Sequence, residues 1–114
     1  SQKYFIRRQE ELGKLNGQRV EVIAKYKKMA TTNNSKNLLF VKVQIDGVEI
    51  TDHAWIKSFY KDEFYTKNIR HHRGEFVKFS ALVSTYYKLD SNGNKVMDYG
   101  FKNIKNLEFL GKEL

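Results

Sequence analysis

The sequence predicts a mainly β domain, a small barrel of five strands with one short helix before the first strand and another between the third and fourth. Two observations lead to this prediction. Apolar and polar residues alternate over several stretches of the chain, which is the period of a strand with one buried face. Compact turn signals, Asp46-Gly47 and residues 90–94 (DSNGN), separate some of these stretches and are typical of β-hairpins.

Residues 1–16 lack this alternation and predict a short amphipathic helix. Phe5, Leu12 and Leu15 fall roughly on one helical face, which would close one end of the barrel. Asn16-Gly17 is a common helix stop. The predicted organisation is therefore a helical extension, residues 1–16, and one β domain, residues 17–114. The alternative role of the helix is docking on a partner protein.

The first strand is predicted over residues 19–29 (RVEVIAKYKKM). Its core face is expected to hold Val20, Val22, Ala24 and Tyr26. A long polar loop is expected over residues 27–37 (KKMATTNNSKN), followed by the second strand over residues 38–45 (LLFVKVQI). Such a hairpin is typical of an arm that grips a polymer.

The second strand is expected to bury one face and expose the other. The buried face would hold Leu39, Val41, Val43 and Ile45. Phe40 and Lys42 would then share the exposed face. Together they would offer a stacking ring and a phosphate contact.

The third strand is predicted over residues 48–56, and a short helix with a loop over residues 57–73. The longest strand follows at residues 75–89, and the last at about residues 95–109, with a bulge or sharp bend expected at Gly100. The core face of the long strand is expected to hold Val77, Phe79, Ala81 and Val83.

This order of elements resembles the OB-fold over about residues 17–110. The resemblance implies that a ligand crosses strands two and three, between the loop joining strands one and two and the loop joining strands four and five. In this chain those segments are residues 27–37, 38–56 and 86–95. The resemblance therefore points to the residues that these segments carry: Lys27, Lys28, Lys36, Phe40, Lys42, Tyr86, Tyr87, Lys88 and Lys95.

The run from VEITDHAWI to GEFVKFSALVSTYYK is also similar to small basic OB-type proteins of bacterial phages and mobile elements. In size and charge the chain resembles accessory proteins encoded beside the polymerase-like replication enzyme of cassette-type elements. That resemblance implies binding of single-stranded DNA in support of replication, and a replication-protein partner such as a polymerase.

The charge of the chain favours a nucleic-acid ligand. Twenty-one Lys and Arg against thirteen Asp and Glu give a net charge of +8, and 14% of the residues are aromatic. Single-strand binders combine a positive groove with aromatic platforms. We expect binding of single-stranded DNA, with RNA as the alternative polymer, and weak sequence preference. The candidate site residues are Lys25, Lys27, Lys28, Lys36, Phe40, Lys42, Tyr86, Tyr87, Lys88 and Lys95.

Three aromatic residues, Trp55, Tyr86 and Tyr87, are candidates for base stacking. Tyr86 and Tyr87 are neighbours in a strand and point to opposite faces, so we expect one to be buried and one to be available for stacking. Trp55 could be a stacking platform, but a core position is the favoured prediction because burying a large ring is strongly stabilising.

We expect neither a metal nor a cofactor, and no catalysis. Asp52-His53 and His71-His72 match no compact ligand spacing. The chain contains no P-loop, nucleophile elbow or HExxH motif, and it has no cysteine. The absence of cysteine also excludes disulfide bonds, and it fits a protein of a reducing compartment. No apolar run approaches the roughly 20 residues that span a bilayer. We therefore expect a cytoplasmic protein.

The alternative function is that of an interaction subunit that docks on a polymerase or other replication enzyme and binds little DNA by itself. Its mark would be an exposed apolar patch, either around Phe5, Leu12 and Leu15 or around Phe59 and Phe64. A third hypothesis is that the chain is an inhibitor that a phage or mobile element directs against a host system.

Overall fold

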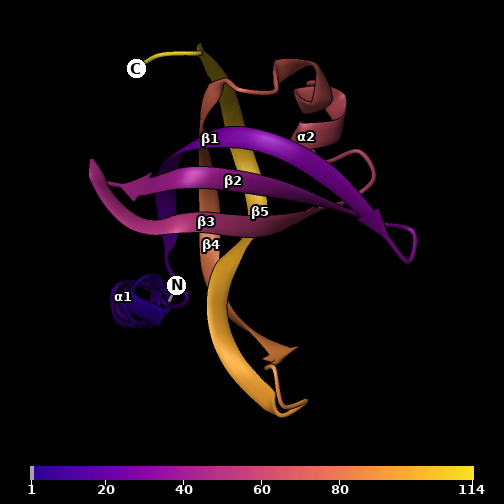
Figure 1. Cartoon of the computed structure of the whole chain (residues 1–114). Coiled ribbons are helices and arrows are strands. Elements are labelled where there is room, and N and C mark those ends of the chain that lie inside the picture. Colours follow the sequence, from indigo (N-terminus) through magenta and orange to yellow (C-terminus); the bar gives the residue numbers. More distant parts are fainter. Residues whose placement is uncertain (1) are drawn as a thin grey trace.

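The computed structural model describes the backbone of residues 2–114 and the side chains of residues 6–114. The elements in chain order are α1 (Gln2–Gly13), β1 (Arg19–Thr32), β2 (Ser35–Ile45), β3 (Val48–Ser58), α2 (Glu63–Thr66), the 3-10 helix η1 (Ile69–His72), β4 (Phe76–Leu89) and β5 (Lys95–Gly111). The strands form one antiparallel sheet in the order β3-β2-β1-β4-β5 (Figure 1). The prediction of a mainly β chain with five strands is confirmed.

The predicted closed barrel is wrong, because β3 and β5 are the two edges of the sheet and no ladder joins them, although the structure describes every residue of both. Helix α1 packs against both edge strands. It sends Leu12 fully into the core. Contacts from α1 therefore take the place of direct hydrogen bonding between β3 and β5.

Helix α1 ends at Gly13, earlier than the predicted stop at Asn16-Gly17. Residues 14–17 form a turn, in which the Gly17 amide donates to the Val83 carbonyl (2.8 Å). Leu15 packs partly buried against the core from this turn, whereas the side chain of Phe5 lies outside the described residues. None of the described helices is long and apolar enough to cross a membrane.

The polar segment between the first two strands is a tight hairpin, and the predicted long loop over residues 27–37 is wrong. β1 runs to Thr32 and β2 starts at Ser35. Only Asn33 and Asn34 turn the chain, with φ of 48° and 65°. Asparagine tolerates this left-handed conformation, and two such residues make the turn that suits a twisted hairpin.

A bulge at Lys42 changes which residues of β2 face the core. Lys42 has φ of 53°, and the pairing with β1 slips there, from Gln44 opposite Ile23 to Val41 opposite Lys25. One extra residue in a strand moves the following side chains to the other face. Before the bulge Leu38 and Phe40 point inward; after it Val43 and Ile45 do.

Phe40 is therefore in the core, and its predicted exposure beside Lys42 is wrong. Its side chain is 0% exposed. Its ring lies 5.6–5.7 Å from the rings of Tyr26, Phe64 and Phe79. Phe64 of α2 and Ile69 of η1 cover this end of the core. The aromatic group around Phe40 joins β1, β2, β4 and α2.

The core faces predicted for β1 and β4 are largely confirmed. Val22, Ala24 and Tyr26 are buried on β1, with Val20 partly buried against them. Val77, Phe79, Ala81 and Val83 are buried on β4. Unlike β2, these stretches pair with each other without interruption from Arg19 to Lys25, so the alternation in the sequence carries through to the structure.

Phe40→Ala is expected to lower the free energy of unfolding by about 3–5 kcal/mol, because it opens a cavity in the aromatic core. Phe59→Ala is the matched control, because that ring is 60% exposed and its loss should cost under about 0.5 kcal/mol. Urea denaturation measures both. Equally small losses of unfolding free energy in the two variants would contradict the buried position of Phe40.

Candidate nucleic-acid interface

Three exposed rings gather in a groove between β3 and the β4–β5 hairpin. Trp55 of β3 is 47% exposed, and Phe59 beyond β3 and Tyr86 of β4 are exposed beside it. The groove has a volume of about 430 Å³. We call it the Trp55 groove; its lining residues are Asn37, Trp55, Lys57, Phe59, Ser84, Thr85, Tyr86, Gly100, Phe101 and Lys102.

The exposure of Trp55 contradicts the favoured prediction that it is a core residue. Ala54 and Ile56 are both buried, and neighbours in a strand point to opposite faces. Trp55 must therefore face outward. The signal was present in the sequence, because a strand that buries Ala54 and Ile56 exposes every residue between and beside them, including Lys57.

Trp55 also lines two smaller hollows that extend the groove. One, of about 140 Å³, reaches along the β4–β5 hairpin past His53, Lys88 and Tyr99. The other, of about 260 Å³, reaches the β1–β2 hairpin at Ala30 and Thr32. The tryptophan is thus the common wall of a continuous surface that runs from one hairpin to the other.

Gly100 allows Tyr86 to lie across the neighbouring strand. Ser84, two residues before Tyr86, pairs with Gly100. A Cβ atom added at Gly100 would stand 3.1 Å from the Tyr86 ring, closer than ordinary contact. Gly100 therefore leaves space that the ring occupies. The bulge predicted at Gly100 is wrong, because β5 pairs regularly with β4 there, and the pairing slips instead between Lys102 and Lys105 and between Lys105 and Glu108.

The buried carboxylate of Asp98 holds the base of the β4–β5 hairpin. Asp98 is 0% exposed. It receives hydrogen bonds from Arg8 Nη2 (2.6 Å), Lys88 Nζ (2.8 Å) and the hydroxyl of Tyr86 (3.3 Å). Burial by itself raises the pKa of Asp98, but the hydrogen bonds from Arg8, Lys88 and the Tyr99 amide outweigh it, so the pKa lies below the ordinary value.

This network fixes two of the predicted site residues. Tyr86 and Lys88 are both anchored by the same oxygen of Asp98. Burial raises the pKa of the Tyr86 hydroxyl, and the Asp98 charge raises it further. The hydroxyl therefore stays protonated as a donor, which leaves the ring of Tyr86 facing the groove.

Tyr86 and Tyr87 are both exposed, which contradicts the prediction that one of them is buried. The end of the β4–β5 hairpin projects away from the rest of the sheet (Figure 1), so neither face of the hairpin is covered there. Tyr87 pairs with the ammonium of Lys95, which lies 4.6 Å from its ring centroid. The two residues lie outside the lining of the Trp55 groove.

Three of the predicted lysines form a second cluster, on β1 and β2. Lys25, Lys27 and Lys42 line one hollow of about 260 Å³. The bulge at Lys42 and a second slip in the pairing, between Tyr26 and Lys28, bring them together.

This lysine cluster adjoins the Trp55 groove across the sheet. One row of paired residues runs Lys25, Val41, His53, and the next runs Lys28, Leu39, Trp55. Strands lie about 4.8 Å apart, so both rows cross three strands within the reach of one bound polymer. Lys28 thereby approaches the groove as well.

Two further predicted site residues, in addition to Tyr87 and Lys95, lie outside the groove and the lysine cluster. Phe40 is in the core, and Lys36 lines a separate cavity, described below. Sequence reasoning about the binding site did not include Lys57, Phe59 and Lys102. In the structure, Lys57 and Lys102 are exposed, and the Lys57 ammonium lies 5.2 Å from the Phe59 ring centroid. Lys57 and Phe59 could have been found from the two-residue spacing that continues from Trp55.

The histidines form separate local pairs. His53 Nδ1 lies 2.8 Å from Asp52. His72 Nδ1 lies 2.9 Å from Glu75, and its ring stacks on Phe109 at 3.6 Å between centroids. Among the described side chains no group of three or more His, Asp or Glu is arranged to hold a metal ion.

Comparison with protein-family models, with curated proteins and with solved structures finds no match to this chain.

Asp98→Asn is expected to cost about 3–5 kcal/mol at neutral pH, because it leaves the buried Arg8 side chain and the half-buried Lys88 side chain without their carboxylate. The pKa of Asp98 is lower in the folded state than in the unfolded state. The stability that the ionised carboxylate contributes is therefore present above the unfolded pKa of about 3.9, and it is lost as the pH falls through the folded pKa. Denaturation midpoints between pH 7 and pH 2.5 should therefore converge for the variant and the original chain.

Asp46→Asn is the matched control for this measurement. Asp46 is exposed in the β2–β3 turn, so its variant should keep the original pH dependence. A constant gap between Asp98→Asn and the original chain down to pH 2.5 would contradict a depressed pKa at Asp98.

Proposed function

We propose that this chain binds single-stranded nucleic acid, DNA in the first place, along the Trp55 groove and the adjoining lysine cluster. The observation that carries the proposal is the solvent exposure of Trp55 in a groove shared with Phe59, Tyr86, Lys57 and Lys102. Exposed rings in a concave, cationic setting are the features that single-strand binders use.

The physical basis is stacking combined with phosphate contacts. A base that stacks on an aromatic side chain contributes about 1–3 kcal/mol, with little dependence on its identity. Unpaired bases can reach such rings, whereas bases in a duplex are already stacked on each other. Lysines along the path release counterions from the backbone. The surface therefore favours single strands and discriminates weakly between sequences.

An OB-type fold is part of the same proposal. The strand order β3-β2-β1-β4-β5 and the helical segment between β3 and β4 are compatible with a partly open OB barrel. The Trp55 groove lies between the β1–β2 and β4–β5 hairpins, the region that OB-folds use for oligonucleotides. An accessory role in the replication of a phage or mobile element extends this proposal from the resemblance alone.

The alternative of a docking subunit gains no specific support from the apolar residues expected to mark it. Leu12 and Phe64 are buried in the chain's own core, so they offer no surface to a partner. Phe59 is exposed, but it lines the Trp55 groove.

Trp55 is the only tryptophan of the chain, so its fluorescence reports directly on the groove. Titration with oligo-dT is expected to quench it. Trp55→Ala should weaken binding of labelled oligo-dT about 5- to 150-fold, which corresponds to one lost stacking contact. Fluorescence anisotropy measures this. Tyr60→Ala is the control, because that exposed ring lies outside the groove lining. Unchanged binding by Trp55→Ala would place the site elsewhere.

The double variant Lys57→Ala and Lys102→Ala is expected to lower the salt dependence of binding. Each phosphate contact of a single strand contributes about 0.7 to the slope of log affinity against log salt, so two lost contacts reduce the slope by about 1.4. Lys105→Ala with Lys112→Ala removes the same charge outside the groove lining and should leave the slope unchanged. No binding at low salt, or equal affinity for duplex DNA, would overturn the proposed function.

A further inference from the structure

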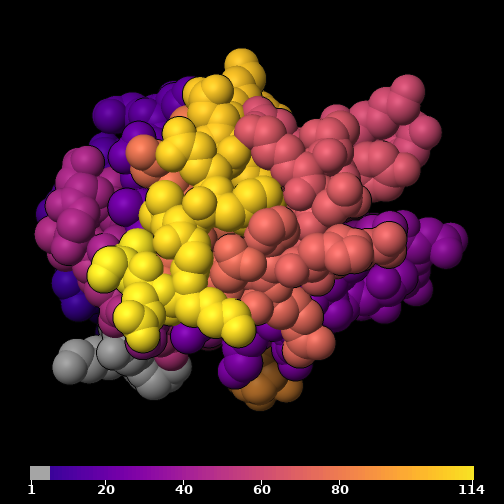
Figure 2. Space-filling view, turned by 90° about the horizontal axis from the view of Figure 1, so that it is seen from above, coloured from indigo at the N-terminus to yellow at the C-terminus, as the bar shows by residue number. Residues whose placement is uncertain are grey.

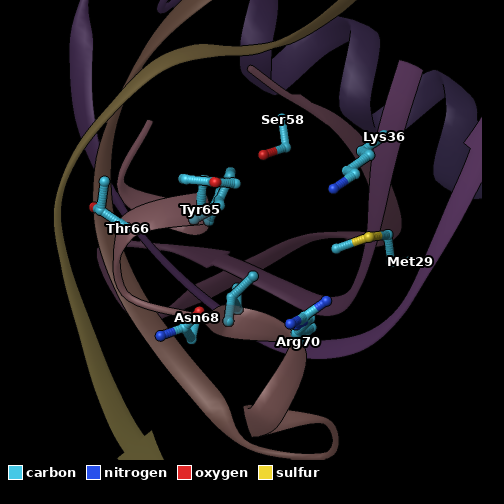
Figure 3. A pocket seen from close by; sticks show the side chains of 9 residues that line it. Met29, Lys36, Ser58, Tyr65, Thr66, Asn68 and Arg70 are labelled. Carbon is cyan, nitrogen blue, oxygen red and sulfur yellow. The ribbon is translucent and has the colours of Figure 1, made fainter. Parts of the chain in front are cut away.

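A second cavity of about 450 Å³ lies between the β1–β2 hairpin and the α2–η1 segment (Figure 3). From above, this hairpin and the segment that follows β3 project on the same side of the molecule (Figure 2). The lining residues are Met29, Lys36, Ser58, Phe64, Tyr65, Thr66, Asn68, Ile69 and Arg70.

The cavity opens on the other face of the hairpin from the Trp55 groove. Lys36 pairs with Ser58, and their neighbours Asn37 and Lys57 pair with each other. The first pair lines the cavity and the second lines the groove. Neighbours in a strand point to opposite faces, so the cavity and the groove are distinct sites separated by the thickness of the sheet.

Two cations enter the cavity without a balancing acid. Lys36 comes from β2 and Arg70 from η1, and both side chains line the same space (Figure 3). No acidic residue belongs to the lining. Among the described side chains, no carboxylate forms an ion pair with either cation. Two unneutralised charges that face one cavity favour a ligand with two negative charges.

The two acidic residues that precede Phe64 in the sequence are already engaged. Glu63 pairs with Lys67 (2.9 Å) and accepts hydrogen bonds from the amides of Asn106 and Leu107. Asp62 accepts hydrogen bonds from the hydroxyl of Ser58 (3.1 Å) and from the amides of Phe59 and Tyr65 (both 2.8 Å). It caps the short helix α2. Its oxygens therefore hold the loop that forms one wall of the cavity, while the cations remain open to a ligand.

The remaining lining is suited to the organic part of such a ligand. Ser58, Thr66 and Asn68 carry hydroxyl and amide groups, whereas Met29, Phe64 and Ile69 are apolar. Tyr65 is 48% exposed and lies 5.3 Å from the ring of Tyr60. A volume of about 450 Å³ falls within the range of small-molecule sites, about 300–1,000 Å³. A bare inorganic anion would leave most of this space empty.

We propose that this cavity binds the phosphate monoester of a nucleotide, with Lys36 and Arg70 on the phosphate and Tyr65 beside the base. A monoester carries about 1.5 to 2 negative charges at pH 7, which matches the two cations better than the single charge of a backbone diester. Arginine also binds phosphate through two donors at once.

Two sources can supply this group, a free mononucleotide or the phosphorylated end of a bound strand. The second source rests on the proposed function. β3 is an edge strand that ends at Ser58, so a strand that leaves the Trp55 groove at Phe59 has to pass only this edge to reach Lys36. The first source is independent of the groove.

Isothermal titration calorimetry with AMP, adenosine and inorganic phosphate tests the site. AMP is expected to bind at least about 10-fold more tightly than adenosine or inorganic phosphate. The double variant Lys36→Ala and Arg70→Ala should bind AMP at least about 10-fold more weakly than the original chain. The control pair Lys105→Ala and Lys112→Ala removes two charges outside the cavity and should bind AMP normally. Both target side chains are exposed, so unchanged unfolding midpoints are expected.

The proposal is overturned if adenosine binds as well as AMP, or if the double variant binds AMP unchanged. Anisotropy with oligo-dT that ends in a phosphate or in a hydroxyl then distinguishes the sources. A preference for the phosphorylated end that disappears in the double variant identifies the strand end. Equal binding of both oligonucleotides beside tight AMP binding identifies the free nucleotide.

The same measurements separate this proposal from the proposed function. Failure of both oligonucleotides to bind, with AMP binding intact, would reject the groove and keep the cavity. Binding of the hydroxyl-ended oligonucleotide with quenching of Trp55, but neither AMP binding nor an end preference, would keep the groove and reject the cavity.

Discussion

The charge of Asp98 is the constraint on which the rest of the structure depends. A fully buried carboxylate is costly unless it is paired and hydrogen-bonded. Asp98 meets this requirement with groups from α1 and from β4, through Arg8, Lys88 and Tyr86. Arg8 also reaches the hydroxyl of Thr51 on β3 (3.5 Å). One guanidinium thus connects the two edges of the sheet that no backbone ladder joins.

This arrangement links stability to the candidate interface. The hairpin of β4 and β5 carries Tyr86 on the wall of the Trp55 groove, and the same Asp98 oxygen anchors Tyr86 and Lys88. A groove exists between β3 and this hairpin because the sheet stays open there, with α1 bridging its edges. Surface that direct strand pairing would have covered is left available, and Trp55 and Phe101 line it.

The second cavity depends on a different part of the chain, the short segment after β3 that contains α2. Asp62 uses both of its oxygens to organise residues 58–65, which sets α2 over the core through Phe64. The hairpin of β1 and β2 forms the opposite wall. Its two faces carry different chemistry, with an aromatic groove on one side and a cationic cavity on the other, because side chains alternate along both strands.

The sequence by itself determined the number and order of the strands, the Asp46-Gly47 hairpin and the core faces of β1 and β4, because these depend on local alternation and local turn chemistry. It did not determine the face of Phe40, because one inserted residue at Lys42 reverses the alternation and composition does not mark where it occurs. Of the residues in the candidate interface, it named Tyr86, Lys88 and the lysine cluster, but it placed Trp55 in the core. Only the tertiary structure decided that β3 and β5 remain unpaired edges. It also decided that Trp55 shares a groove with Tyr86 and Lys102, and that Lys36 lines a separate cavity. Each depends on which distant segment packs beside a given face. At the open edge, the buried pair of Arg8 and Asp98, 90 residues apart, holds this packing.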